Sequence, residues 1–161
     1  MTNNATPFGT TADGKQASLV TLTNAAGLEA SFSDYGATWV SMITPDRAHQ
    51  LADVLIGFDD VTGYETQPFI SSVVGRYANR ISQGRFALDG IQYQLDRNEE
   101  AHHLHGGVDN LSVKMWHWQK DSAQNRVKFT CESPEGECGY PGHVLSLIHI
   151  SEPTRRTPIS Y

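Results

Sequence analysis

The chain has 161 residues, 39% of them hydrophobic, and its 18 Asp and Glu residues outnumber its 12 Lys and Arg residues to give a formal net charge of -6 at pH 7. A chain of this length can bury a real core, because a domain of about 150 residues removes roughly 70% of its unfolded surface from water. The acidic balance excludes nucleic acid and anionic membrane surfaces as main partners, since both require a basic face.

Alternation of apolar and polar residues predicts β-strands from about residue 16 onward. Early examples are 19–22 and 38–43, and Asn, Gly or Pro stops each of them. No window shows a sustained period near 3.6 residues, so we expect little helix. The pattern indicates an all-β sandwich.

Two hairpins are expected further along the chain. Residues 86–95 contain Asp89-Gly90, which supplies the two positive-φ positions of a type I′ turn between two apolar alternations. Residues 116–119 and 127–131 flank a polar turn and predict a second hairpin.

The last segment departs from this pattern. After a new strand begins near residue 145, residues 146–161 show neither a strand period nor a closing turn. Their text, SLIHISEPTRRTPISY, resembles the conceptual translation of a sequencing adapter, and such segments are excluded from fold reasoning. We therefore expect residues 1–145 to be natural sequence and residues 146–161 to be a non-native read-through tail. This tail should pack poorly, expose Ile148, Ile150 and Ile159 at least partly, and have no consistent strand partner.

Neither the cysteines nor the N-terminus predicts secretion. Cys131 and Cys138 have no partner at zinc-finger spacing, so we expect free thiols in a reducing compartment. The start, MTNNATPFGTTADG, has neither a basic region nor an apolar segment, and no stretch approaches the length of a membrane span. A cytoplasmic protein follows as the expectation.

Two glycine-flanked motifs carry the functional signal: GRYANRI at 75–81 and HHLHGG at 102–107. Arg offers up to five fixed donors, Asn offers donors and an acceptor, and His offers a proton that can move near neutral pH. This combination suits a neutral polyhydroxylated ligand better than a phosphate or a base edge. The residues themselves predict a sugar site.

Seven segments, taken together in order and spacing, resemble the N-terminal part of aldose 1-epimerases, also called galactose mutarotases. They are 24–27, 34–37, 44–47, 53–59, 75–81, 104–107 and 139–142. The resemblance implies one large antiparallel β-sandwich of the galactose mutarotase-like supersandwich type, of which this chain would be the first part. It also implies interconversion of the α and β anomers of hexoses such as glucose or galactose, with no metal and no cofactor.

The resemblance assigns roles to three residues. Asn79 and Arg80 match an Asn-Arg pair that contacts sugar hydroxyls, and His105 matches a histidine that binds the sugar and assists the chemistry. The family's proton donor and base would both lie beyond Leu145, so this chain alone is expected to be inactive.

Other residues of the motifs have structural alternatives. Arg76 could equally buttress the sheet or touch ligand, and His102 and His103 are interpreted as loop residues. His149 lies in the suspected tail and receives no role. The tryptophans could stack on sugar rings, but tryptophans in strands more often belong to the core. They are Trp39, Trp116 and Trp118.

Three competing functions stay open. A carbohydrate-binding β-sandwich without catalysis is favoured by the absence of a recognisable acid and base. A sugar-phosphate epimerase relative would need further cations around the site. A cupin-like metal pair of His103 and His105 would need a glutamate shortly afterwards, and the residues after His105 contain none.

Overall fold

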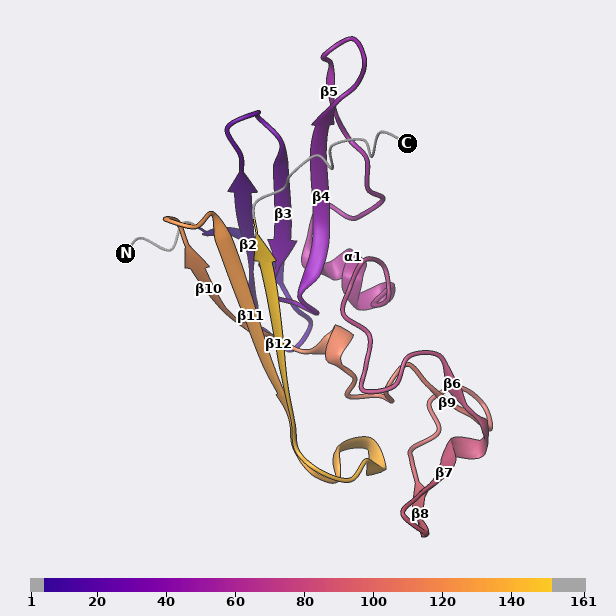
Figure 1. Ribbon diagram of the computed structural model, residues 1–161. Helices are drawn as coiled ribbons and strands as arrows, with labels where there is room; N and C mark the ends of the chain where they lie inside the picture. The colour runs from indigo at the N-terminus through magenta and orange to yellow at the C-terminus, as the bar shows by residue number, and fades with distance from the viewer. Residues whose placement is uncertain (1–4, 152–161) are drawn as a thin grey trace, which may run out of the picture.

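The computed structural model describes residues 5–151, and antiparallel strands predominate in it (Figure 1). The helices are α1 (Val61–Thr66) and the 3-10 turns η1 (Ser82–Gly84), η2 (Leu111–Val113) and η3 (Glu137–Gly139). The strands are β1 (Ala5–Thr10), β2 (Gln16–Thr23), β3 (Glu29–Ser33), β4 (Thr38–Pro45), β5 (Leu51–Asp53), β6 (Arg80–Ile81), β7 (Arg85–Leu88), β8 (Ile91–Gln94), β9 (His103–Leu104), β10 (His117–Asp121), β11 (Arg126–Ser133) and β12 (Val144–Ser151). The prediction of a largely β chain is confirmed. Within residues 5–151, no helix combines the length and apolar character needed to cross a membrane.

Two antiparallel sheets pack face to face in the larger part of the molecule. One has the order β1-β2-β3-β4-β5 and the other the order β10-β11-β12. Side chains of a strand point alternately to its two faces, so alternate residues such as Val20 and Leu22 of β2 enter the space between the sheets. Val127 and Phe129 of β11 meet them there, and Phe129 lies 6.5 Å from Phe32 of β3 between ring centroids.

Helix α1 covers the opposite face of the larger sheet. Val61 and Tyr64 are buried against a second apolar cluster that includes Ala17, which lies on the other face of β2 from the inter-sheet core. The helix begins where the Asp60 carboxylate accepts a hydrogen bond of 2.9 Å from the backbone N–H of Thr62.

Two small sheets lie at one end of this sandwich (Figure 1). In one, Arg80 and Ile81 of β6 pair with Leu104 and His103 of β9. The other is the β7–β8 hairpin, whose turn residues have φ of 52° at Asp89 and 79° at Gly90. The prediction of a hairpin at Asp-Gly is confirmed, and so is the second hairpin, formed by β10 and β11.

Residues 144–151 correct the expectation for the C-terminal segment. They form β12, which pairs with β11 from Val144 opposite Ser133 to Ser151 opposite Arg126. The prediction that residues 146–161 lack a strand partner is therefore wrong for 146–151. Ile148 and Ile150 alternate with exposed positions and pack, only partly buried, against the inter-sheet core, as the free edge of β11 allows. Ile159 and the rest of 152–161 lie outside the described residues, and the read-through origin of the segment stays a prediction.

The tryptophans divide between core and surface. Trp116 is buried and Trp118 packs half-buried against the inter-sheet core, as predicted. Trp39 is 40% exposed, so the prediction of a core residue is wrong for it. A register shift between β3 and β4 sets Trp39 opposite Phe32, and its ring stacks on Phe32 at 5.8 Å with one side left open.

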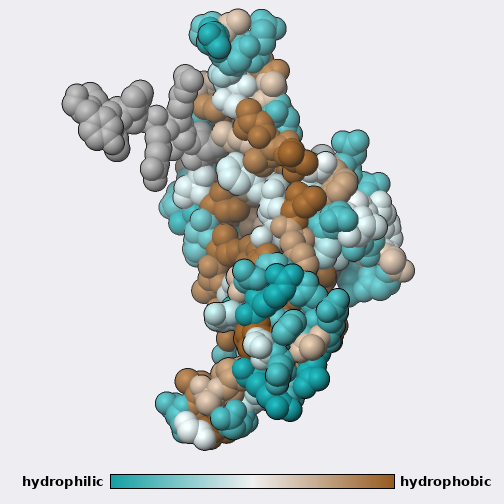
Figure 2. Space-filling model, turned by 90° about the vertical axis from the view of Figure 1, so that its right-hand side faces the viewer, coloured by the Kyte–Doolittle hydropathy of each residue, from teal (hydrophilic) through white to brown (hydrophobic). Residues whose placement is uncertain are grey.

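Hydrophobic side chains also reach the surface on the β5 side of the molecule (Figure 2). The largest exposed ones near β5 are Leu51, Val54 and Ile56. Leu51 begins β5, a three-residue strand at the edge of the sheet, and Val54 and Ile56 follow it outside the strand.

Candidate functional site

The two motifs meet where β6 pairs with β9. The β7–β8 hairpin lies between them in the sequence and turns the chain back on itself. Two hydrogen bonds of 3.0 Å then join the motifs: the backbone N–H of His105 donates to the carbonyl of Asn79, and the backbone N–H of Asn79 donates to Nδ1 of His105. Asn79, Arg80 and His105 therefore lie side by side.

The hydrogen bond from the Asn79 backbone N–H selects the tautomer of the neutral His105 ring. Because Nδ1 accepts a hydrogen bond, the neutral ring carries its proton on Nε2. No acceptor for Nε2 occurs among residues 5–151. The ring is half-buried and packs against Phe69, with ring centroids 4.4 Å apart. His105 is thus a held hydrogen-bond donor with one free N–H.

Arg80 is held by Glu99. Nε of Arg80 lies 2.5 Å from one carboxylate oxygen and Nη2 lies 2.5 Å from the other, so the pair is bidentate. Nη1 donates to Oδ1 of Asn79 at 3.4 Å. The Arg80 guanidinium lowers the pKa of Glu99, and the carboxylate raises the pKa of Arg80 in turn.

Arg76 hydrogen-bonds to other parts of the protein and so has a structural role. Its Nε donates to Oγ of Ser133 at 2.7 Å, and Nη2 donates to the carbonyls of Ser133 and Pro134 at 2.8 and 2.7 Å. Nη1 donates to the carbonyls of Pro141 and Gly142 at 3.0 and 2.8 Å. All five N–H groups are used inside the protein, so of the two roles left open by the sequence, the buttress is the one that the geometry supports.

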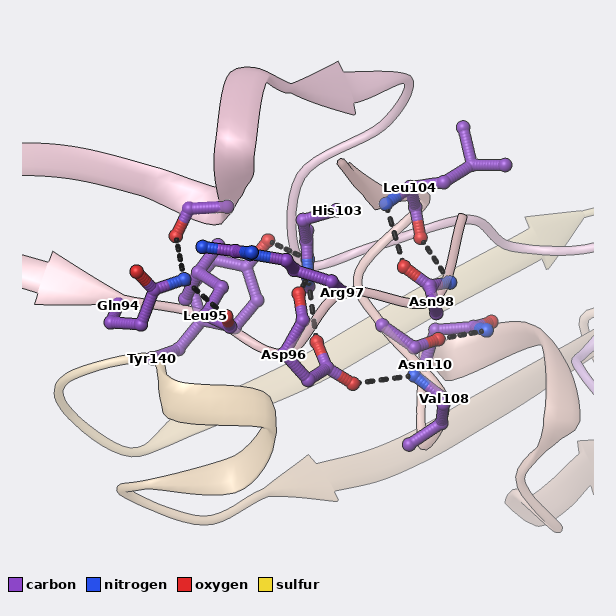
Figure 3. A network of polar contacts seen from close by, with 12 residues as sticks. Gln94, Leu95, Asp96, Arg97, Asn98, His103, Leu104, Val108, Asn110 and Tyr140 are labelled. Atoms are coloured by element: carbon purple, nitrogen blue, oxygen red, sulfur yellow. Dashed lines mark hydrogen bonds and ion pairs between the residues drawn. The ribbon is translucent and has the colours of Figure 1, made fainter. Parts of the chain in front are cut away.

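A buried histidine stabilises the loop behind the site (Figure 3). His103 is 0% exposed, with Nδ1 at 2.7 Å from Oδ1 of Asp96 and Nε2 at 2.7 Å from the hydroxyl of Tyr140. The other Asp96 oxygen accepts from the backbone N–H of Val108 at 3.0 Å. Burial, followed by the neighbouring Cys138 and Asp96, raises the pKa of Tyr140 to about 12.

Sequence reasoning missed this network because it treated His103 as an ordinary loop residue. No sequence signal marks His103, because residues 102–104 are His-His-Leu and show no apolar–polar alternation, although His103 is buried and its neighbours are half-exposed. Both ring nitrogens of His103 are engaged, and His105 follows the end of β9 with φ of 53°. The two histidines therefore do not form the shared strand face that a cupin-like metal pair requires.

Asn98 stabilises the strand that precedes His105 (Figure 3). Its side-chain amide donates to the carbonyl of Leu104 at 2.9 Å and accepts from the Leu104 backbone N–H at 2.7 Å. The Asn98 side chain thus makes the two hydrogen bonds that a neighbouring strand would make to Leu104. It does so on the edge of β9 that faces away from Arg80 of β6. Leu104, and with it His105, is held from both sides.

A cavity of about 530 Å³ adjoins the motifs. Arg80 lines it together with the apolar surfaces of Tyr77, Phe86 and Tyr140. Its volume falls in the range of about 300 to 1,000 Å³ that is typical of small-molecule sites. Asn79 and His105 do not line it, so Arg80 is the member of the trio that joins the hydrogen-bonding groups to the cavity.

The family model of aldose 1-epimerases matches residues 18–151. The chain belongs to the aldose 1-epimerase family. Curated members include the galactose mutarotase of Bos taurus, 41% identical over 118 residues that make up 73% of this chain and 34% of the relative. The aldose 1-epimerase of Haemophilus influenzae is 39% identical over 133 residues, 82% of this chain and 38% of the relative.

Solved structures of the aldose 1-epimerase fold agree with this assignment. A GalM/aldose epimerase homologue from C. elegans superposes with a TM-score of 0.77 at 29% identity, covering 84% of this chain and 42% of that one. The galactose 1-epimerase of Lactobacillus acidophilus, at 24% identity and a TM-score of 0.76, shares the fold. This chain spans only about a third of the length of the curated epimerases it matches.

Proposed function

We propose that the protein to which this chain belongs interconverts the α and β anomers of hexoses such as glucose or galactose, and that Asn79, Arg80 and His105 bind the sugar. One observation carries the proposal: Asn79 contacts both of the other residues, donating its N–H to Nδ1 of His105, which leaves Nε2–H free, and accepting from Nη1 of Arg80. The β6–β9 pairing sets Arg80 opposite Leu104, the residue before His105. The proposal requires neither metal nor cofactor, and it keeps a cytoplasmic location as its expectation.

The chemistry assigns distinct tasks to these groups. A base removes the proton of the anomeric hydroxyl, the bond between C1 and the ring oxygen breaks, and an acid protonates the ring oxygen. The aldehyde then rotates and recloses on its other face. A donor such as Nε2–H of His105, aimed at a sugar oxygen, stabilises the charge that develops there. We propose that the proton donor and the base come from sequence beyond Leu145.

A second candidate, carbohydrate binding without catalysis, is favoured for this chain alone by one observation. Two carboxylates that contact the motifs are already engaged, Glu99 with Arg80 and Asp96 with His103. A carboxylate held in this way is a poor base for an anomeric hydroxyl. Both candidates share the same binding residues and differ in whether other sequence completes the site.

Polarimetry on freshly dissolved α-D-galactose tests the proposal. The 161-residue chain should leave the rate at the buffer value, because an acid and a base each contribute about 10² to 10⁴ in rate. A chimera in which this chain replaces the matching third of the bovine galactose mutarotase should accelerate the reaction. His105→Ala in the chimera should slow it by about 10² or more, with circular dichroism confirming the fold.

Two outcomes contradict this account. Rapid mutarotation by the chain alone would place the acid and base within it. A folded chimera that keeps its full rate after His105→Ala would remove His105 from the chemistry.

A further inference from the structure

Arg80 is the cation of the candidate site, and Glu99 faces it. The Arg80 side chain is 54% exposed and that of Glu99 is 32% exposed, so both border the open side of the site. Arg76, the other arginine of the first motif, directs all its donors into the scaffold. The charge that an incoming ligand meets at Arg80 is therefore that of the Arg80–Glu99 pair.

The pairing decides which Arg80 donors are left for a ligand. A guanidinium carries five N–H groups, of which Glu99 takes two and Asn79 takes one. The remaining hydrogens lie on Nη1 and Nη2, on neighbouring corners of a planar group. Their spacing suits two adjacent hydroxyl oxygens of a sugar ring.

The backbone holds Glu99 in place for this task. The Glu99 N–H donates to the carbonyl of His102 at 3.2 Å, and the His102 N–H donates to the carbonyl of Glu99 at 2.8 Å, which closes a tight loop. Nδ1 of His102 accepts from the backbone N–H of Gln83 at 3.2 Å and anchors this loop to η1. The carboxylate is thus presented to Arg80 from a fixed position.

A neutralised arginine discriminates between ligands of different charge. A hexose hydroxyl accepts from Arg80 without approaching a like charge. A phosphate group bound at the same corner brings its negative charge near the Glu99 carboxylate, and unit charges about 4 to 6 Å apart in water repel by roughly 1 kcal/mol. Such a repulsive element disfavours one class of ligand while the attractive contacts stay unchanged.

We propose that Glu99 is a positioning and specificity-determining residue: it aims the free N–H groups of Arg80 at a neutral hexose and disfavours hexose phosphates. This role rests on the proposed sugar site and names its substrate class. It separates the chain from the sugar-phosphate epimerase alternative, because that reaction calls for an uncompensated cation.

Calorimetric titration of the 161-residue chain with D-galactose and with D-galactose 6-phosphate tests the role. The wild type should bind galactose more tightly than its phosphate. Glu99→Gln should weaken galactose binding about three- to ten-fold and strengthen phosphate binding by a similar factor. Glu99→Asp keeps the charge but shortens the reach, so it should weaken galactose binding while still disfavouring the phosphate. Glu29→Gln, the same chemical change at the start of β3, should alter neither.

The outcomes separate the two levels of the proposal. Galactose binding by the wild type, with both affinities unchanged in Glu99→Gln, would overturn the role of Glu99 alone. No galactose binding by the wild type would overturn the sugar site and this role with it. A third readout needs no ligand: the Nε–H resonance of Arg80 should exchange slowly with water in the wild type and rapidly in Glu99→Gln, and equal exchange in both would contradict the positioning.

Discussion

Two residues behind the site, Asp96 and Tyr140, provide hydrogen-bond partners for the buried His103. A buried polar group is costly unless it is hydrogen-bonded, and His103 finds a partner for each ring nitrogen. Asp96 precedes β9 in the chain, and Tyr140 follows η3. These contacts therefore fasten the segments of Asp96 and Tyr140 to the strand that precedes His105.

Replacing Tyr140 by Phe should destabilise the protein by about 1 to 3 kcal/mol at neutral pH, because Nε2 of His103 would lose its partner in a buried place. Urea denaturation followed by tryptophan fluorescence measures this. Tyr77→Phe, at an exposed tyrosine, should stay within about 0.5 kcal/mol of the wild type.

The contribution of Tyr140 to the unfolding free energy should decrease at high pH, and Tyr140→Phe tests this. Burial raises the pKa of Tyr140 from 10.0 to about 12, so the folded state holds this proton more tightly than the unfolded state. The stabilisation is present below about pH 10 and is lost as the pH rises through about 12. Tyr140→Phe should make the fall in unfolding free energy shallower in this window, and an unchanged slope would contradict the assignment.

The proximity of the three candidate residues was easier to predict from the sequence than the contacts that hold them, and their role in sugar binding stays a prediction. Asn79, Arg80 and His105 stand in motifs separated by a clear hairpin, so their meeting could be predicted. Glu99 could not be found in this way, because its position depends on a loop closed by two backbone hydrogen bonds with His102. The role of Arg76 stayed open because four of its five acceptors are backbone carbonyls, which the identities of the residues do not reveal.

At the scale of elements, β12 shows that alternation near a free edge suffices for pairing. Ser146, Ile148 and Ile150 occupy one face of the strand, and β11 leaves an edge open beside them. The prolines and arginines farther on led the sequence interpretation to set the whole of 146–161 aside. A read-through origin and a paired strand are compatible, because the ladder uses backbone groups that every non-proline residue carries.

Two alanine variants of β12 test its packing. Ile148→Ala should lower the unfolding free energy by about 1 to 2 kcal/mol, below the roughly 2 to 5 kcal/mol of a fully buried site, because Ile148 is only partly buried against the core. Leu147→Ala, next to it and 52% exposed, should change it by less than about 0.5 kcal/mol. Equal effects in chemical denaturation would show that the strand does not pack as described.

At the scale of the whole molecule, the sandwich and the candidate site are stabilised by different kinds of contact. The two large sheets arise from alternation, so strands such as β2, β4, β10 and β11 could be predicted, although β12 was not. The site lies in short strands and irregular segments at one end, where hydrogen bonds from Arg76, Asn98 and His103 replace long ladders. The shape of such a region depends on hydrogen bonds between side chains and the backbone. These hydrogen bonds cannot be predicted from the spacing of apolar residues in the sequence.

The most direct test of the sugar site is a titration of the 15N-labelled 161-residue chain with D-galactose, followed by NMR. The backbone amides of Asn79, Arg80 and His105 should shift saturably, and Arg80→Ala should abolish the effect while the rest of the spectrum keeps the dispersion of a folded chain. Saturable shifts that gather instead around a separate pocket lined by Lys114 and His117, or no saturable shift at all, would contradict the account.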